Sequence, residues 1–314
     1  MSSNTSANAT NHQQRAAERL RRMSAAVRLS FSWLGTRKSL DADQTAEAAV
    51  TFGAERQYLS AGKKLLDTRH PTFRAVTRVR NRMLNYWRGM SLPFPEPGLR
   101  LIRQDRISTF NVHMEELKQE LEESVRRLDD EYAELREAAR LRLGRLYNPA
   151  DYPPSLAGMF RVAWDFPSIE PPDYLRQLHP DIYELECQRM RQRFDEAVQL
   201  AEQAFTEELL QLVSHLSERL NGQSDGKPKI FRDSAVTNLT EFFQRFRRLN
   251  IRSNDQLEQL VDQCQDLVRS VEPQGLRDSQ GLRQSISLEL GRVQDSLESL
   301  LVDRPRRNIL RRPR

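Results

Sequence analysis

One stripe of apolar residues, repeated every three or four positions, constrains the fold of this chain most strongly. It runs from Met114 to Leu146, and the positions between its members are almost all charged or polar. Its central members are Leu117, Leu121, Val125, Leu128, Tyr132 and Leu135. This spacing keeps one face of an α-helix apolar. We therefore expect one long helix from Asp105 or Ser108 to about Tyr147. Its mean step of about 3.6 residues favours weak supercoiling with a partner helix.

A second stripe of the same kind lies in a helix expected from Pro180 to Leu220. Its members include Phe194, Val198, Phe205, Leu209 and Leu212. Two long one-sided helices predict a hairpin in which both stripes form one buried seam. The predicted fold class is mainly α: a long antiparallel, coiled-coil-like helical hairpin with a small β element and a C-terminal helical bundle.

The β element is predicted from alternating apolar residues. The segments LSFSWL (29–34) and MFRVAWDF (159–166) alternate in this way, which is typical of strands. Residues 99–102 are a third candidate strand, and we expect the three to pair in one sheet. A short basic helix is expected over 15–28, and a helix that Asp41 or Asp43 caps is expected to end at Phe52 before Gly53.

Five segments follow along the chain. They are a disordered N-terminus (1–14), a helical and β head (15–104), the hairpin with its β insertion near 159–166 (105–220), a C-terminal three-helix segment (230–301) and a basic disordered tail (302–314). One C-terminal helix interleaves phenylalanines with Arg245, Arg247 and Arg248. We interpret it as a core helix with a solvated basic face, and a membrane-surface helix is the alternative.

Charge is distributed unevenly over the 314 residues. The net charge is +5, but residues 1–28 carry +4 and residues 303–314 carry +5, so the body is mildly acidic. The tail arginines are Arg304, Arg306, Arg307, Arg311, Arg312 and Arg314. Such clusters contact nucleic acid, anionic lipid or an acidic partner, or only keep the chain soluble.

Motifs for bond-breaking chemistry are missing from the sequence. It contains no H-E-x-x-H, C-x-x-C, G-x-x-x-x-G-K-[ST], G-x-G-x-x-G or G-x-S-x-G. Asp129, Asp130, Glu131 and Glu134 form an acidic cluster that we interpret as a solvated helix face. We therefore predict no catalytic residue, cofactor or metal, and no enzyme activity.

The two cysteines, Cys187 and Cys264, make no disulfide framework and are expected to act as small buried hydrophobes in a reducing cytoplasm. No apolar run approaches the length of about 18 residues that a membrane span needs.

The order of several segments resembles a known family. The segments FSWLGTRKSL, YLSAGKKLL, LPFPEPGLRLI, ARLRLGRLYNPADYPPSLAGMFRVAWDF and IFRDSAVTNLTEFFQRFRRLNI follow one another in this chain. Together they resemble an uncharacterised bacterial and phage family of long helical coiled-coil proteins. Its members are found beside MoxR-type AAA+ ATPases and von Willebrand A-domain proteins. The resemblance covers about residues 25–300. It implies such an ATPase or A-domain protein as partner and supplies no catalytic or binding residues.

Three functional hypotheses remain open at this point. The first is a cytoplasmic, non-enzymatic adaptor or assembly component, with the head as docking surface and the hairpin as a spacer or homo-oligomer interface. The second is a nucleic-acid-associated protein that binds through its arginine-rich termini. The third is an amphipathic membrane-active or pore-forming protein. The sequence itself does not identify the biological role.

Overall fold

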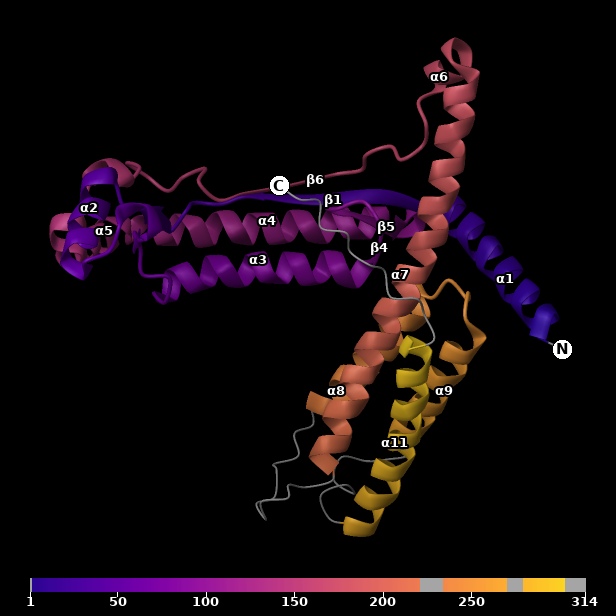
Figure 1. Cartoon of the computed structure of the whole chain (residues 1–314). Coiled ribbons are helices and arrows are strands. Elements are labelled where there is room, and N and C mark those ends of the chain that lie inside the picture. Colours follow the sequence, from indigo (N-terminus) through magenta and orange to yellow (C-terminus); the bar gives the residue numbers. More distant parts are fainter. Residues whose placement is uncertain (1, 221–233, 270–278, 303–314) are drawn as a thin grey trace. The chain divides into compact units, whose positions relative to one another are not determined.

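The computed structural model divides the chain into two compact units (Figure 1). The described residues are 2–220, 234–269 and 279–302. Unit 1 is drawn from residues 1–26, 90–104 and 167–314, and unit 2 from residues 27–89 and 105–166. The chain therefore passes from one unit to the other four times. The five-segment division along the sequence stays a prediction.

Unit 2 is built mainly from helices: α2 (Ala42–Phe52), α3 (Pro71–Met90), α4 (Ile107–Asp130) and α5 (Tyr132–Leu143). α3 and α4 run antiparallel, as two contacts show. At one end the Thr72 hydroxyl donates to Glu131 at 3.1 Å, and at the other Tyr86 stacks on Phe110 with ring centroids 5.8 Å apart. The apolar face of each helix is thus buried within unit 2.

The first predicted stripe is buried from Leu117 to Leu135, with every predicted member at most 7% exposed. The predicted single helix, however, is two helices that Glu131 separates, and the 3-10 turns η3 (Gly144–Leu146) and η4 (Pro149–Asp151) follow. The interruption coincides with two acidic side chains, Asp129 and Glu131, that bond to other parts of unit 2. Apolar spacing does not register such contacts, so it overestimated the length of the helix.

Unit 1 is a helical assembly around the long helix α7 (Pro180–Leu220). The other helices are α1 (Ser2–Met23), α6 (Asp173–Leu178), α8 (Ser234–Leu249), α9 (Asp255–Arg269) and α11 (Gln280–Val302). Phe194, Val198, Phe205 and Leu209 share one core with side chains of α1, α8, α9 and α11, and Leu212 packs against its edge. Figure 1 shows α8, α9 and α11 along the C-terminal half of α7.

The predicted long helical hairpin is not confirmed. The stripe of α4 and α5 is buried within unit 2, whereas the stripe of α7 is buried in the core of unit 1. Periodic spacing establishes that a helix buries one face, but it does not identify the partner that covers this face. Here α3 covers the first stripe and the C-terminal helices cover the second.

A small antiparallel sheet confirms the predicted strands. In unit 2, β1 (Ser24–Ser32) pairs with β6 (Arg161–Asp165), with Phe31 opposite Val162. Arg28 donates two hydrogen bonds to Asp165, at 3.0 and 2.6 Å, at the end of this pair. In unit 1, β5 (Leu99–Arg103) pairs with β4 (Ser91–Pro93), a strand that the proline-rich sequence did not predict.

Two N-terminal predictions are wrong. Residues 2–23 form the helix α1, where a disordered lead over 1–14 was expected, and this helix ends at Met23 instead of residue 28 because β1 begins at Ser24. No proline or glycine interrupts residues 2–23, and Ala16, Ala17 and Leu20 are buried in the unit 1 core. Tertiary packing therefore explains helix formation in a segment of weak helical pattern.

The described part of the C-terminal segment contains the helices α8, α9 and α11, and its division into three helices over 230–301 stays a prediction. Phe242, Phe243 and Phe246 of α8 are buried, so this segment is a core helix and not a membrane-surface helix. Arg247 and Arg248 are exposed, as a solvated basic face requires, whereas Arg245 is half-buried and pairs with Glu208 of α7.

Candidate interaction surface

A lobe of unit 2, residues 37–66, presents the most unusual surface in the described part of the chain. It consists of β2 (Arg37–Ser39), α2, the 3-10 turn η1 (Arg56–Tyr58) and β3 (Gly62–Lys64). The Asp41 side chain accepts from the Gln44 backbone N–H at 2.8 Å, and the Gln44 side chain accepts from the Asp41 N–H at 3.3 Å. At the other end Gly53 has φ +62°, the left-handed geometry that ends many helices. The predicted helix and both of its end residues are confirmed.

A buried carboxylate fixes the lobe to the rest of unit 2. Lys38 and Lys63 lie directly opposite each other in the β2–β3 pair, an arrangement in which like charges repel. Asp151 offsets this repulsion, since Lys38 Nζ lies 2.6 Å and Lys63 Nζ 2.7 Å from its two carboxylate oxygens. The Asp151 and Lys63 side chains are only 2% and 4% exposed. Lys63 also donates to the Leu146 carbonyl at 2.7 Å.

The two lysines and the burial of this site change the pKa values of Asp151 and Tyr152. Hydrogen bonds from Lys38 and Lys63 lower the pKa of Asp151 below its ordinary value, so the carboxylate stays ionised at neutral pH. Next to it, burial raises the pKa of Tyr152 to about 12, so the phenol keeps its proton and donates to the Leu65 carbonyl at 3.0 Å. These bonds hold the start and the end of the lobe against the η4 turn.

Three large apolar residues of the lobe are exposed. Every residue from 50 to 58 is exposed, and Val50, Phe52 and Tyr58 are 83%, 78% and 82% exposed. Only Ala49 is buried in α2. Three large apolar side chains held in water within nine residues, at the end of a well-capped helix, make this segment a candidate protein-binding surface.

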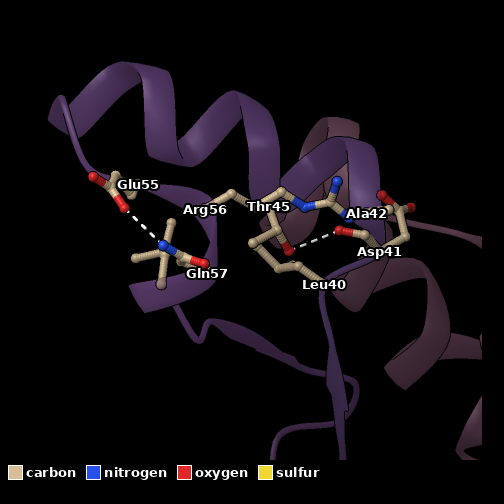
Figure 2. A pocket seen from close by; sticks show the side chains of 8 residues that line it. Leu40, Asp41, Ala42, Thr45, Glu55, Arg56 and Gln57 are labelled. Carbon is tan, nitrogen blue, oxygen red and sulfur yellow. Dashed lines mark hydrogen bonds between the residues drawn. The ribbon is translucent and has the colours of Figure 1, made fainter.

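A shallow depression of about 650 Å³ lies beside these residues (Figure 2). Its lining residues are Leu40, Asp41, Ala42, Thr45, Glu55, Arg56, Gln57 and Leu59. Figure 2 shows two internal hydrogen bonds across its rim, from Thr45 Oγ1 to the Asp41 carbonyl at 2.7 Å and from Gln57 to Glu55 at 2.8 Å. The lining mixes the apolar residues Leu40, Ala42 and Leu59 with polar and charged residues of both signs.

The lobe carries charges of both signs. Its acidic residues are Asp41, Asp43, Glu47 and Glu55, and its basic residues are Arg37, Lys38, Arg56, Lys63 and Lys64. Glu47 lies 3.2 Å from Arg145, in an exposed pair that contributes little energy. The lobe as a whole is therefore close to neutral.

The prediction that the acidic cluster Asp129, Asp130, Glu131 and Glu134 is a solvated helix face is only partly right. Asp130 and Glu134 are exposed, as a solvated face requires. Asp129, however, accepts from the Ser155 hydroxyl at 2.7 Å and from the Leu156 N–H at 2.6 Å. It therefore anchors the loop after η4, and Glu131 bonds to Thr72 as described above.

The remaining predicted residues do not form a second site in the structure. The predicted seam residues are buried in two separate cores, and all six tail arginines lie outside the described residues. Cys264 is buried, which raises its thiol pKa to about 12, and Cys187 is half-buried. Within residues 2–220, 234–269 and 279–302 no group of three metal-ligating side chains converges. No helix in these ranges is long and apolar enough to span a membrane.

Comparison of the chain with protein-family models, with curated proteins and with solved structures gives no match.

Sequence reasoning missed Lys38, Lys63 and Asp151. Asp151 lies 113 residues from Lys38 along the chain, and nothing in its local pattern distinguishes it from a turn aspartate. The exposed apolar side of α2 carried a weak signal, because Val50 and Phe52 close a helix of mostly small residues that has no apolar stripe.

Proposed function

We propose that this chain is a protein-interaction adaptor without catalytic activity of its own, and that the lobe of residues 37–66 is its docking surface. One observation carries the proposal: Val50, Phe52 and Tyr58 are almost fully exposed on a lobe that is capped and fixed by a buried ion pair. A preordered apolar surface loses little conformational entropy when it binds.

The apolar residues of the lobe select the chemistry of the partner, because the lobe carries nearly equal numbers of acidic and basic residues. A complementary surface presents apolar side chains, and the burial of Phe52 and Tyr58 supplies most of the affinity. The resemblance to proteins found beside MoxR-type AAA+ ATPases and von Willebrand A-domain proteins suggests one of these as the partner, and a cytoplasmic location agrees with it.

The test measures binding of the full chain to the purified ATPase and A-domain protein by biolayer interferometry. Phe52→Asp and Tyr58→Asp each place a charge in the apolar contact and should raise Kd at least about tenfold. Leu288→Asp is the matched control, because Leu288 of α11 is 61% exposed but lies in unit 1. Binding that neither lobe variant weakens contradicts the proposed surface.

Nucleic-acid binding through the arginine-rich termini is a second candidate that the charge of the two ends favours. The N-terminal arginines give this hypothesis less support than the tail, because four of the arginines in residues 1–28 contact other described residues. The contacts are Arg19 with Ile251, Arg21 with Glu170, Arg22 with Glu18, and Arg28 with Asp165. Deletion of residues 303–314 tests binding through the C-terminal arginines. The deletion should abolish binding to duplex DNA, and added salt should weaken binding by the intact chain. Binding that survives the deletion, or that salt does not weaken, contradicts this second candidate.

A further inference from the structure

The helix α3 carries charge of one sign only. It contains five arginines and no acidic residue, and it is the only α-helix among the described residues that lacks an acidic residue. The five are Arg74, Arg78, Arg80, Arg82 and Arg88. A helix of this composition produces a positive potential over the surface that it exposes.

The exposed side of α3 consists almost entirely of arginine and asparagine. After Pro71, every exposed residue of this helix is one of these two types, and we call the six of them the arginine face: Arg74, Arg78, Asn81, Arg82, Asn85 and Arg88. Five of the six recur at steps of four, three, four and three residues from Arg74 to Arg88, which places them on one side of the helix. The apolar residues of α3 are buried, so packing within unit 2 holds the arginine face toward water.

Most of the charge on this face is not neutralised within the described part of the chain. Arg82 donates to both carboxylate oxygens of Glu120, at 2.5 and 2.7 Å. Arg74, Arg78 and Arg88 form no ion pair with a described residue. Arg74, Arg78 and Arg82 also follow one another at steps of four residues, a spacing at which like charges destabilise a helix. An anion bound along the face would relieve this repulsion.

The side chains of the arginine face indicate the class of anion that it binds. Protein–protein interfaces have a core of apolar and aromatic side chains, and helices that bind a membrane surface insert an apolar face. The apolar side of α3 is buried, and its exposed side offers guanidinium and amide groups. Arginine and asparagine are among the side chains that contact phosphate oxygens in protein–DNA complexes. The face therefore fits a nucleic-acid backbone better than a protein or lipid surface.

We propose that the arginine face of α3 binds the phosphate backbone of a nucleic-acid duplex without selecting a base sequence. Arg74 and Arg88 lie about 21 Å apart along the helix axis, a length that matches about six phosphates of one strand. Each guanidinium can donate to two oxygens of one phosphate, and each asparagine amide can donate one further hydrogen bond. This face is separate from the docking lobe of residues 37–66 and from the tail of residues 303–314.

Fluorescence anisotropy of a labelled DNA duplex of about 20 base pairs, titrated with the full chain in about 0.1 M salt, tests the proposal. The double variant Arg74→Gln with Arg78→Gln should raise Kd at least about tenfold. It should also lower the slope of log Kd against log salt concentration by about 2, because two phosphate contacts are lost. Circular dichroism melting confirms that each variant is folded.

The matched control is the double variant Arg126→Gln with Arg136→Gln. It removes the same charge from two exposed arginines of the same unit, in α4 and α5, and should leave both Kd and the salt slope close to those of the wild type. A wild type that does not bind the duplex overturns the inference, as does a control that weakens binding as much as the α3 variant.

Binding through the tail arginines alone would leave the α3 variant as tight as the wild type. That result overturns this inference and keeps the second candidate function. The docking lobe is tested with protein partners and without a duplex, so its failure does not affect this measurement.

Competition identifies the anion. Unlabelled duplex, polyglutamate and vesicles that contain phosphatidylserine are added at equal concentrations of negative charge, and the unlabelled duplex should displace the labelled duplex most effectively. Displacement by polyglutamate or by the vesicles that equals displacement by the duplex assigns the face to an acidic protein or to a lipid surface, and it overturns the proposed nucleic-acid contact.

Discussion

At the scale of single residues, Asp151 connects the lobe of residues 37–66 to the rest of unit 2. It pairs with two lysines that the β2–β3 register places opposite each other, and the Lys63 ammonium is almost completely withdrawn from water. A buried ammonium without a counter-charge is far more costly than an exposed one. The conformation of the docking lobe therefore depends on one carboxylate.

The substitution Asp151→Asn should lower the free energy of unfolding by about 2 kcal/mol at neutral pH, because the amide removes the charge but still accepts a hydrogen bond. The two lysines lower the pKa of Asp151 in the folded state. An acid of this kind stabilises the fold above its unfolded-state pKa of about 4, and the contribution is lost as the pH falls through the lower folded-state pKa. The difference between the wild type and Asp151→Asn should thus shrink in acid.

Urea denaturation from pH 7 to pH 2 checks this prediction, with Asp130→Asn as the control because Asp130 is exposed. A gap between Asp151→Asn and wild type that stays constant over the whole pH range contradicts an ionised Asp151.

At the scale of elements, the sequence predicted local structure well and packing partners poorly. The helices α2, α8, α9 and α11 and the strand pair of β1 with β6 follow from spacing, caps and alternation, which neighbouring residues determine. The elements that cover each long apolar stripe cannot be predicted from its spacing, because α4 and α7 carry nearly the same pattern but pack in different units. The acid cluster shows the same limit, since only the fold reveals that Asp129 binds the loop at Leu156.

Two glycines, Gly53 after α2 and Gly89 inside α3, allow a matched test of backbone conformation. Gly53 has φ +62° and no atom would contact an added Cβ, so Gly53→Ala tests backbone strain alone and should cost about 1 kcal/mol. Gly89 also has open space around it but lies inside α3 with ordinary helical φ, so Gly89→Ala should stabilise by about 0.5 kcal/mol. Thermal denaturation of both variants measures the two signs. If both shift the midpoint in the same direction, the left-handed end of α2 is not as described.

At the scale of the whole molecule, two cores stabilise one chain. The three tryptophans, Trp33, Trp87 and Trp164, all belong to unit 2, so tryptophan fluorescence reports on that unit alone. Circular dichroism reports on the helices of both units.

Two core substitutions make this division measurable. Leu128→Asp places an unpaired charge in the unit 2 core, and Leu209→Asp places one in the unit 1 core. Each should cost about 3 kcal/mol or more. Leu128→Asp should lower the denaturation midpoint by fluorescence, whereas Leu209→Asp should lower the circular dichroism midpoint and leave the fluorescence transition in place. Equal shifts of both signals in both variants contradict two separate units.

The four passages of the chain between its units also order events during synthesis on the ribosome. Leu20 of α1 belongs to the same core as Val198, and α1 packs chiefly against α7, so α1 cannot bury its apolar residues until α7 has been translated. Residues 27–166 supply all of unit 2 before then. Leu20 therefore stays uncovered while unit 2 is synthesised, and it is during this interval that a chaperone has the most to bind.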